Sequence, residues 1–264
     1  MNFYFLYDLP NWLFASVIIL FFVIFGLIGL MLTRKFVKRL HHTDQSHNDI
    51  VSYYLAAMTV FYGITLGLVA AGTWNTYSSL NNKVDEEAQV VASIYRDVRA
   101  YPDTLKSKLQ HDLKNYVDNV IHVSWPQQRM GVLPTQSGLY LDTFQNHLMS
   151  YKPETIRDQV IEAEVFRQFN NLVEARRSRI NSTHTGLPAV MWTLVVIGAM
   201  VCIVVSWFFD VKNFAMHVAM TILLAGLLGL MIYLIGTMDN PFRGKINVTP
   251  AALEMLYHQM VKHP

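Results

Sequence analysis

The stretch GLVAAGTWNTYSSLNNKVDEEAQVVASIYRDVRAYP, residues 67–102, decides the fold. It begins in an apolar segment, passes Trp74, and continues through polar and charged residues with no further Gly or Pro before Pro102. Beyond Trp74 the apolar side chains recur every seven residues, as on one face of a helix. They are Tyr77, Val84, Val91 and Val98. We therefore predict one uninterrupted helix from about Asp49 to Ala100, which spans a membrane and continues as a stalk.

Composition and hydropathy indicate an integral membrane protein. The chain has 264 residues, of which 52% are hydrophobic and 15% are charged. A typical soluble domain carries about 25% charged residues, so this chain is short of groups that solvate a surface. Four apolar runs are long enough to cross a bilayer, which takes about 20 residues. They cover residues 12–32, 51–74, 187–209 and 213–236.

These runs divide the chain into five segments. We expect a first transmembrane helix and basic loop at residues 1–50, a second transmembrane helix at 51–74 and an extramembrane helical bundle at 75–186. The third and fourth transmembrane helices occupy 187–236, and a turn with a short amphipathic helix occupies 237–264. The predicted fold class is an all-α membrane protein with four transmembrane helices and an extramembrane helical bundle, in which the second span continues as a stalk.

Amphipathic segments after the stalk supply partners for its apolar stripe. Asp103 is the expected cap of a helix that ends at SWPQQRMG, residues 124–131. A second helix is expected from Ser137 to about Tyr151, and a longer one after Pro153. We expect these helices to pack beside the stalk as a bundle.

Six segments in a fixed order resemble those of the bacterial bestrophin-like family, from about Asn48 to Pro250. They are HNDIVSYYLAAMTVFYGITLGLVAAGTW, EEAQVVASIYRDVRAYP, NYVDNVIHVSWPQQRMG, LVEARRSRI, LPAVMWTLVVIG and DNPFRG. The resemblance implies the architecture of bestrophins, which are pentameric anion channels with four spans and a helical domain that continues from the second. It also implies that the second helix lines a pore. Shared architecture does not by itself establish a shared activity.

The second span offers candidates for a pore lining or gate. They are Thr59, Tyr62, Gly63 and Thr65. Small and hydroxylated side chains suit a narrow, mostly apolar passage. The same residue types also mediate close helix packing in lipid, and the sequence leaves both interpretations open.

Glu87 falls on the apolar seam of the stalk, where a carboxylate is costly unless it has a partner. The candidate ion-pair partners are Arg96, Arg176, Arg177 and Arg179. One interpretation makes Glu87 part of a charged ring or gate in a pore. The other makes it one half of a structural ion pair inside the bundle.

Several function classes are disfavoured. No Asp, Glu, Lys or Arg lies in the central portion of any span, whereas proton pumps, voltage sensors and many ion-coupled transporters need such charges. The net charge of +2 does not indicate a nucleic-acid partner. No nucleophile with a base and no phosphate-binding glycine loop is present, so we predict neither an enzyme nor a cofactor. His41, His42 and His47 match no strong metal-ligand spacing, so we predict no metal site.

The positive-inside rule and the family resemblance predict opposite membrane orientations. Arg34, Lys35, Lys38 and Arg39 lie in the short first loop, and the positive-inside rule places that loop in the cytoplasm. In a bacterial inner membrane the helical bundle would then lie on the periplasmic or outer side. Bestrophins have the opposite arrangement.

Two functions remain as hypotheses. The first is a homo-oligomeric membrane protein of bestrophin-like architecture that conducts small ions, with anions preferred, and whose partners are the lipid bilayer and copies of itself. The alternative is a non-conducting membrane scaffold or sensor whose helical domain binds another partner.

Overall fold

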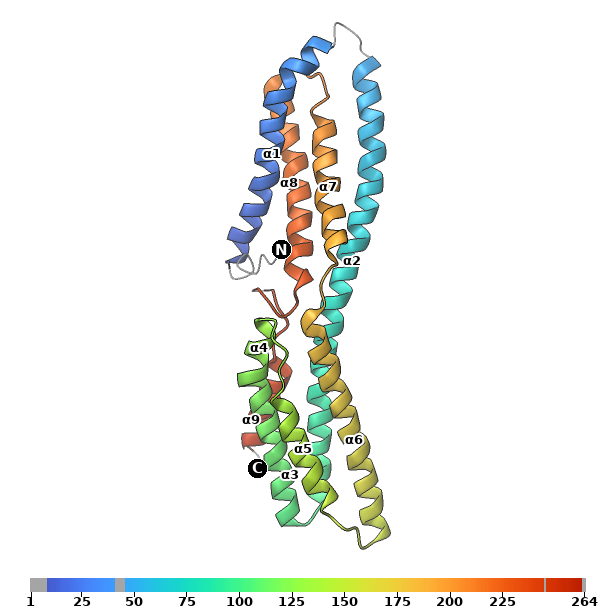
Figure 1. Cartoon of the computed structure of the whole chain (residues 1–264), viewed down its shortest axis with the longest axis vertical. Helices are drawn as coiled ribbons and strands as arrows, with labels where there is room; N and C mark the ends of the chain where they lie inside the picture. Colours follow the sequence, from blue (N-terminus) through green and yellow to red (C-terminus); the bar gives the residue numbers. More distant parts are fainter. Residues whose placement is uncertain (1–8, 41–45, 245, 263–264) are drawn as a thin grey trace. The chain divides into compact units, whose positions relative to one another are not determined.

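The computed structural model describes residues 9–40, 46–244 and 246–262, and within these ranges every regular element is a helix (Figure 1). The α-helices are α1 (Asn11–Leu40), α2 (Ser46–Asp97), α3 (Asp103–Asn119), α4 (Trp125–Arg129), α5 (Ser137–Met149), α6 (Ile156–Asn181), α7 (Ala189–Ser206), α8 (Phe214–Asp239) and α9 (Ala251–Lys262). Short turns of other helix types are η2 (Val98–Ala100), η3 (Val120–Ser124) and η4 (Ser182–His184). The predicted all-α fold is confirmed.

Helix α2 is continuous over 52 residues and leads directly into the turn η2. The prediction of one uninterrupted helix through residues 49–100 is therefore confirmed, although the helix begins slightly earlier, at Ser46. No proline interrupts this stretch, and its three glycines all lie in the apolar part before Trp74.

The chain packs as two compact units. The membrane unit comprises residues 1–75 and 186–246, and the bundle comprises residues 76–185 and 247–264. Helix α2 contributes its first part to the membrane unit and its second part to the bundle. Helix α9 belongs to the bundle.

The membrane unit holds α1, α7, α8 and the first part of α2, and each of these four helices is long and apolar enough to cross a bilayer. Helices α1, α7 and α8 lie side by side (Figure 1). Gly229 permits a close approach of the α8 and α1 backbones, because a Cβ atom added there would lie 2.9 Å from the Cα of Ile19 on α1. The buried core of this unit includes Phe22, Leu66, Val69, Val195, Ala199, Ile203, Ala225 and Ile232.

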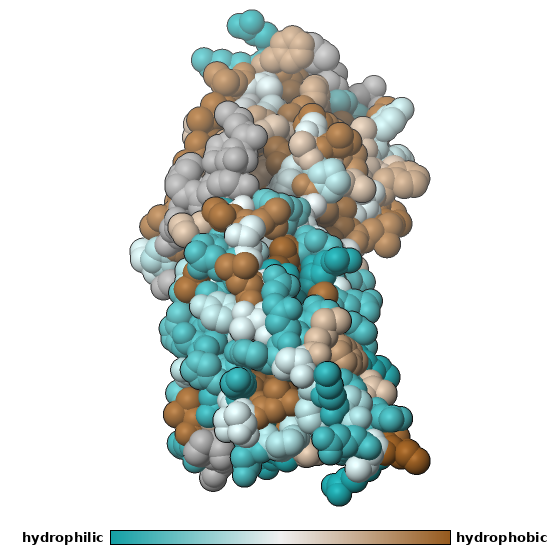
Figure 2. Space-filling model, turned by 60° about the horizontal axis from the view of Figure 1, so that its bottom comes forward, coloured by the Kyte–Doolittle hydropathy of each residue, from teal (hydrophilic) through white to brown (hydrophobic). Residues whose placement is uncertain are grey.

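The bundle is built around the apolar stripe of α2. As predicted, this stripe is buried, with an exposed fraction of 1% or less at Leu80, Val84, Val91, Ile94 and Val98. The other bundle helices contribute further buried side chains, including Leu109, Leu113, Phe144, Val165, Leu172, Leu253 and Met260. On the face shown in Figure 2, the bundle is mostly hydrophilic and the membrane unit is mostly hydrophobic.

One local prediction about α3 is wrong. Asp103 is the first residue of α3 rather than its cap; Pro102 takes the cap position, and the Asp103 carboxylate accepts a hydrogen bond from Lys106 at 2.6 Å. The helical path continues from α3 through the π turn η3 into α4 and ends at Arg129, within the SWPQQRMG segment, as predicted. Pro126 lies in the first turn of α4, where a missing N–H is tolerated.

Candidate functional site

Glu87 and Arg179 form an ion pair in the interior of the bundle. Both side chains have an exposed fraction of 0%. The guanidinium of Arg179, on α6, approaches the carboxylate of Glu87, on α2, with two N–H groups: Nε lies 2.6 Å from Oε2, and Nη2 lies 3.2 Å from Oε1. This two-pronged geometry is the strongest form of an arginine–carboxylate contact.

Two further side chains complete the cluster around this pair. The hydroxyl of Tyr116, on α3, donates a hydrogen bond to Glu87, and Arg179 donates one to the side-chain oxygen of Gln128, on α4. The Gln128 amide nitrogen donates in turn to the hydroxyl of Thr183 at 2.9 Å. We call Glu87, Arg179, Tyr116 and Gln128 the charge cluster. Its buried polar groups have partners, which is the condition for tolerating them in a core.

The cluster fixes the charge states of Arg179 and Tyr116. Burial alone lowers the pKa of Arg179, but the negative charge of Glu87 and its hydrogen bond to the guanidinium raise it, so the pKa stays above its ordinary value. Burial, and then the negative charge of Glu87, raise the pKa of Tyr116 well above its ordinary value. Tyr116 therefore remains a neutral hydrogen-bond donor, and Arg179 remains a cation, across the physiological pH range.

Arg179 is the one candidate arginine that contacts Glu87. Arg96 is exposed and lies 3.5 Å from the carboxylate of Asp97. Arg176 donates from Nε to the hydroxyl of Ser137 at 3.0 Å, and Arg177 is exposed. Because Glu87 is fully buried, its carboxylate faces the interior of the bundle and not a solvent-filled passage.

The hydroxyl groups of the second-span candidates bond within the membrane unit. Thr59 donates to the carbonyl of Leu55 at 2.7 Å, and Thr65 donates to that of Phe61 at 2.9 Å, so both satisfy their own helix. Tyr62 instead donates to the carbonyl of Val195, on α7, at 2.8 Å.

The Tyr62 ring lies directly on Gly198, where an added Cβ would come within 2.5 Å of two ring atoms. Tyr62 thus has the contacts of a residue that packs α2 against α7. Beside it, an apolar groove of about 660 Å³ runs between these helices, and its lining includes Met58, Phe61, Tyr62, Thr65, Leu194 and Ile197.

Gly63 lies on a face of α2 that the described chain leaves uncovered. A Cβ added at Gly63 would meet no atom within 4 Å, and the same holds at Gly67. Exposed residues at helical spacing continue this surface, which we call the open face of α2: Ala56, Val60, Gly63, Gly67 and Ala71. In the most apolar 18-residue segment of α2, only 17% is buried inside the chain. The corresponding segments of the other three spans are 28% to 33% buried.

The sequence did not reveal Tyr116 and Gln128 as members of the charge cluster. Both come from other helices than Glu87 and Arg179, and no local pattern marks a polar residue that will meet a distant charge. Among the residues that the structure describes, no group of three or more His, Cys, Asp or Glu side chains has the arrangement of a metal site. His41 and His42 lie outside the described residues.

Comparison with known proteins identifies the family that has this architecture. The sequence pattern of the bestrophin-like domain matches residues 20–253, which is most of the chain. The chain belongs to the bestrophin-like family. None of the curated proteins matches this bestrophin-like chain.

Solved structures confirm the bestrophin-like fold. The crystal structure of a variant of a bacterial bestrophin homolog from Klebsiella pneumoniae has a TM-score of 0.70 at 11% identity, and the match covers 94% of this chain and 99% of that one. A second variant of that homolog has a TM-score of 0.70 at 10% identity, with 94% and 98% covered. At such identities the likeness is one of fold, so the activity must be argued from the residues of this chain.

Proposed function

We propose that this bestrophin-like chain assembles into a homo-oligomeric channel for small ions, with anions preferred. The observation that carries the proposal is the open face of α2. This face is free of charge, contains two glycines with empty space beside them, and belongs to the span that is least buried within one copy of the chain. A helix with such a face suits packing against other copies of itself around a common axis.

The chemistry of the open face suits a gated apolar passage. Small residues let neighbouring helices approach closely in lipid. Apolar constrictions conduct ions when they are wet and close by dewetting, so a channel needs no charged side chain at its narrowest point. The preference for anions rests on the family, since bestrophins are anion channels.

The candidate residues then take different roles. Gly63 faces the passage, and Thr59 borders it with a hydroxyl that is satisfied by its own helix. Tyr62 and Thr65 line the groove between α2 and α7, which receives a neighbouring copy. Glu87 and Arg179 hold the bundle together and do not contact the ion.

We further propose that the protein resides in a bacterial inner membrane with its bundle on the outer side. The basic residues at the end of α1 support this orientation through the positive-inside rule. A membrane-impermeant thiol reagent would label a Glu86→Cys variant in intact spheroplasts if the orientation is right. Labelling only after lysis would reverse it.

Ion flux from the reconstituted protein tests the channel directly. We expect liposomes that contain the purified oligomer to release chloride faster than empty liposomes. Oligomer that is correctly assembled but does not release chloride, bromide or potassium would overturn the proposal. A single heterologous protein that cross-links to the bundle in cells would then favour the scaffold or sensor alternative.

A further inference from the structure

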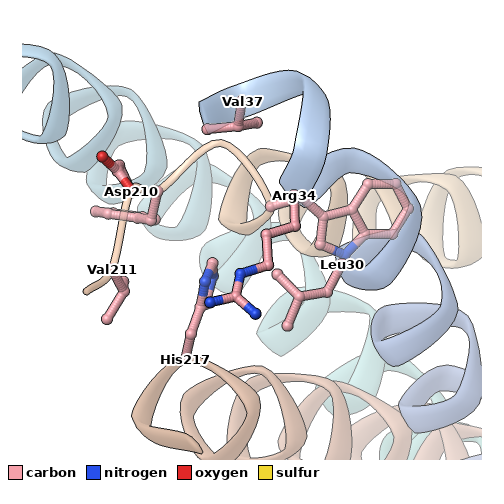
Figure 3. A pocket seen from close by; sticks show the side chains of 8 residues that line it. Leu30, Arg34, Val37, Asp210, Val211 and His217 are labelled. Carbon is pink, nitrogen blue, oxygen red and sulfur yellow. The ribbon is translucent and has the colours of Figure 1, made fainter. Parts of the chain in front are cut away.

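A small cavity lies in the membrane unit where α1 ends beside the connection from α7 to α8 (Figure 3). Its volume is about 10 Å³, which is room for a single water-sized atom. Arg34, Trp207, Asp210 and His217 are the polar residues of its lining. The cavity is therefore a point at which one oxygen atom of a ligand can enter, and not a pocket for a whole molecule.

Arg34 presents a positive charge to this cavity. Its guanidinium stacks on the ring of Phe214, with Cζ 4.0 Å from the ring centroid. Stacking uses the flat face of the guanidinium and leaves the N–H edge available. No carboxylate among the described residues lies within ion-pair distance of Arg34. Figure 3 shows the guanidinium beside the imidazole of His217.

One further lining residue, Trp207, favours an acceptor. The indole N–H of Trp207 is buried and has no acceptor among the described residues, and an unsatisfied buried donor is costly. The Nε2 atom of His217 lies 3.1 Å from the carbonyl oxygen of Ser206 and donates its proton there, so this proton is not offered to a ligand. A guanidinium edge without a carboxylate and an indole N–H without an acceptor, among the described residues, together suit an anionic oxygen.

The cavity also lies at the boundary of the apolar part of the chain. The apolar span of α1 ends at Val37, α7 ends at Ser206, and α8 begins at Phe214. Lys35 and Arg39 are exposed near the same end of α1. Exposed aromatic side chains accompany them, with exposed fractions of 59% at Phe36 and 42% at Phe208. Basic groups beside exposed rings are typical of the headgroup region of a bilayer.

We propose that this corner binds the phosphate of an anionic phospholipid headgroup. One phosphate oxygen enters the cavity and accepts hydrogen bonds from Arg34 and Trp207, while the rest of the headgroup stays outside near Lys35. The acyl chains lie along the exposed apolar surface of α1. The ligand chemistry is that of a phosphate oxygen, and the small volume of the cavity favours a tethered lipid phosphate over a free ion.

Asp210 is the lining residue that opposes this binding. Its backbone is fixed by Asn48, which donates to the Asp210 carbonyl at 2.9 Å and accepts from the Asp210 N–H at 2.9 Å. Figure 3 shows its carboxylate directed away from the guanidinium of Arg34. The carboxylate therefore weakens the attraction for an anion without blocking the cavity, and we expect Asp210→Asn to tighten lipid binding.

Native mass spectrometry of the full chain in detergent tests the site, with short-chain phosphatidylglycerol as the probe and phosphatidylcholine as the neutral comparison. Arg34→Gln is expected to weaken phosphatidylglycerol binding by about tenfold or more, as the loss of charged hydrogen bonds does. The matched control Lys35→Gln removes the same charge one residue away and should cost no more than roughly fivefold, the effect of one diffuse surface charge. Trp207→Phe removes only the N–H and should weaken binding severalfold.

Three other outcomes would overturn the proposal. Equal losses in Arg34→Gln and Lys35→Gln would show general surface attraction and overturn the site. Equal binding of phosphatidylglycerol and phosphatidylcholine by the wild type would do the same. Displacement of the lipid by millimolar inorganic phosphate would identify a free-oxyanion site instead of a lipid site. If Arg34→Gln does not fold, Trp207→Phe and Asp210→Asn still test the proposal, because they must shift binding in opposite directions.

Discussion

Glu87→Gln is expected to lower the free energy of unfolding by about 3–5 kcal/mol, because it leaves the buried Arg179 guanidinium without its counter-charge. The change is nearly isosteric, so the loss reports the charge and not a cavity. For a chain of this size the apparent Tm should fall by roughly 6–20 °C. Thermal melting of the detergent-solubilised protein, followed by far-ultraviolet circular dichroism, measures it.

The neighbouring Glu86→Gln is the matched control. It makes the same change one residue earlier on α2, at an exposed side chain, and should leave the Tm unchanged. The double variant Glu87→Leu with Arg179→Met should be less destabilised than the sum of its single changes, because it removes both buried charges together. Equal melting of Glu86→Gln and Glu87→Gln would show that the charge cluster does not stabilise the fold.

Gly63→Leu is expected to reduce ion flux by at least about tenfold, since a bulky side chain on the open face of α2 either narrows the passage or separates neighbouring copies. The protomer itself has room for the change, because a Cβ at Gly63 meets no atom within 4 Å. Helix propensity also favours Leu over Gly. Chloride release from liposomes at matched protein content gives the flux.

Gly226→Leu provides the comparison for this substitution. Gly226, on α8, likewise has no atom within 4 Å of an added Cβ, so the two variants place the same side chain in equally open space. Only Gly63 lies on the helix that we assign to the passage. An equal loss of flux in both variants, or no loss in either, would show that the open face of α2 does not line the ion passage.

The sequence predicted the fold more fully than the site. Hydropathy located the four spans, and the seven-residue spacing of Val84, Val91 and Val98 predicted that α2 continues into the bundle, because both signals are local and periodic. One helix start was predicted less well. Whether Asp103 or Pro102 caps α3 depends on the local backbone path, which periodicity does not encode.

Glu87 shows which features of the site could be predicted from the sequence. Its place on the apolar seam predicted a buried carboxylate that needs a cation, and four arginines remained as candidates. Arg177 lies on another face of α6, whereas Arg176 lies three residues before Arg179 on the same face. Only the packing of the helices distinguishes Arg179, which meets Glu87, from Arg176, which meets Ser137. The role of Gln128 depends on three helices meeting at one point, so no pattern within a single segment predicted it.

The native mass of the purified protein in mild detergent tests the central claim most directly. That claim is that several copies surround one axis with the open face of α2 toward it. The chain has a mass of 30.3 kDa, and we predict one discrete species that corresponds to a closed ring of more than two copies, as symmetric oligomers form. A monomer or a dimer would contradict the claim, because neither has enough copies of α2 to enclose a passage.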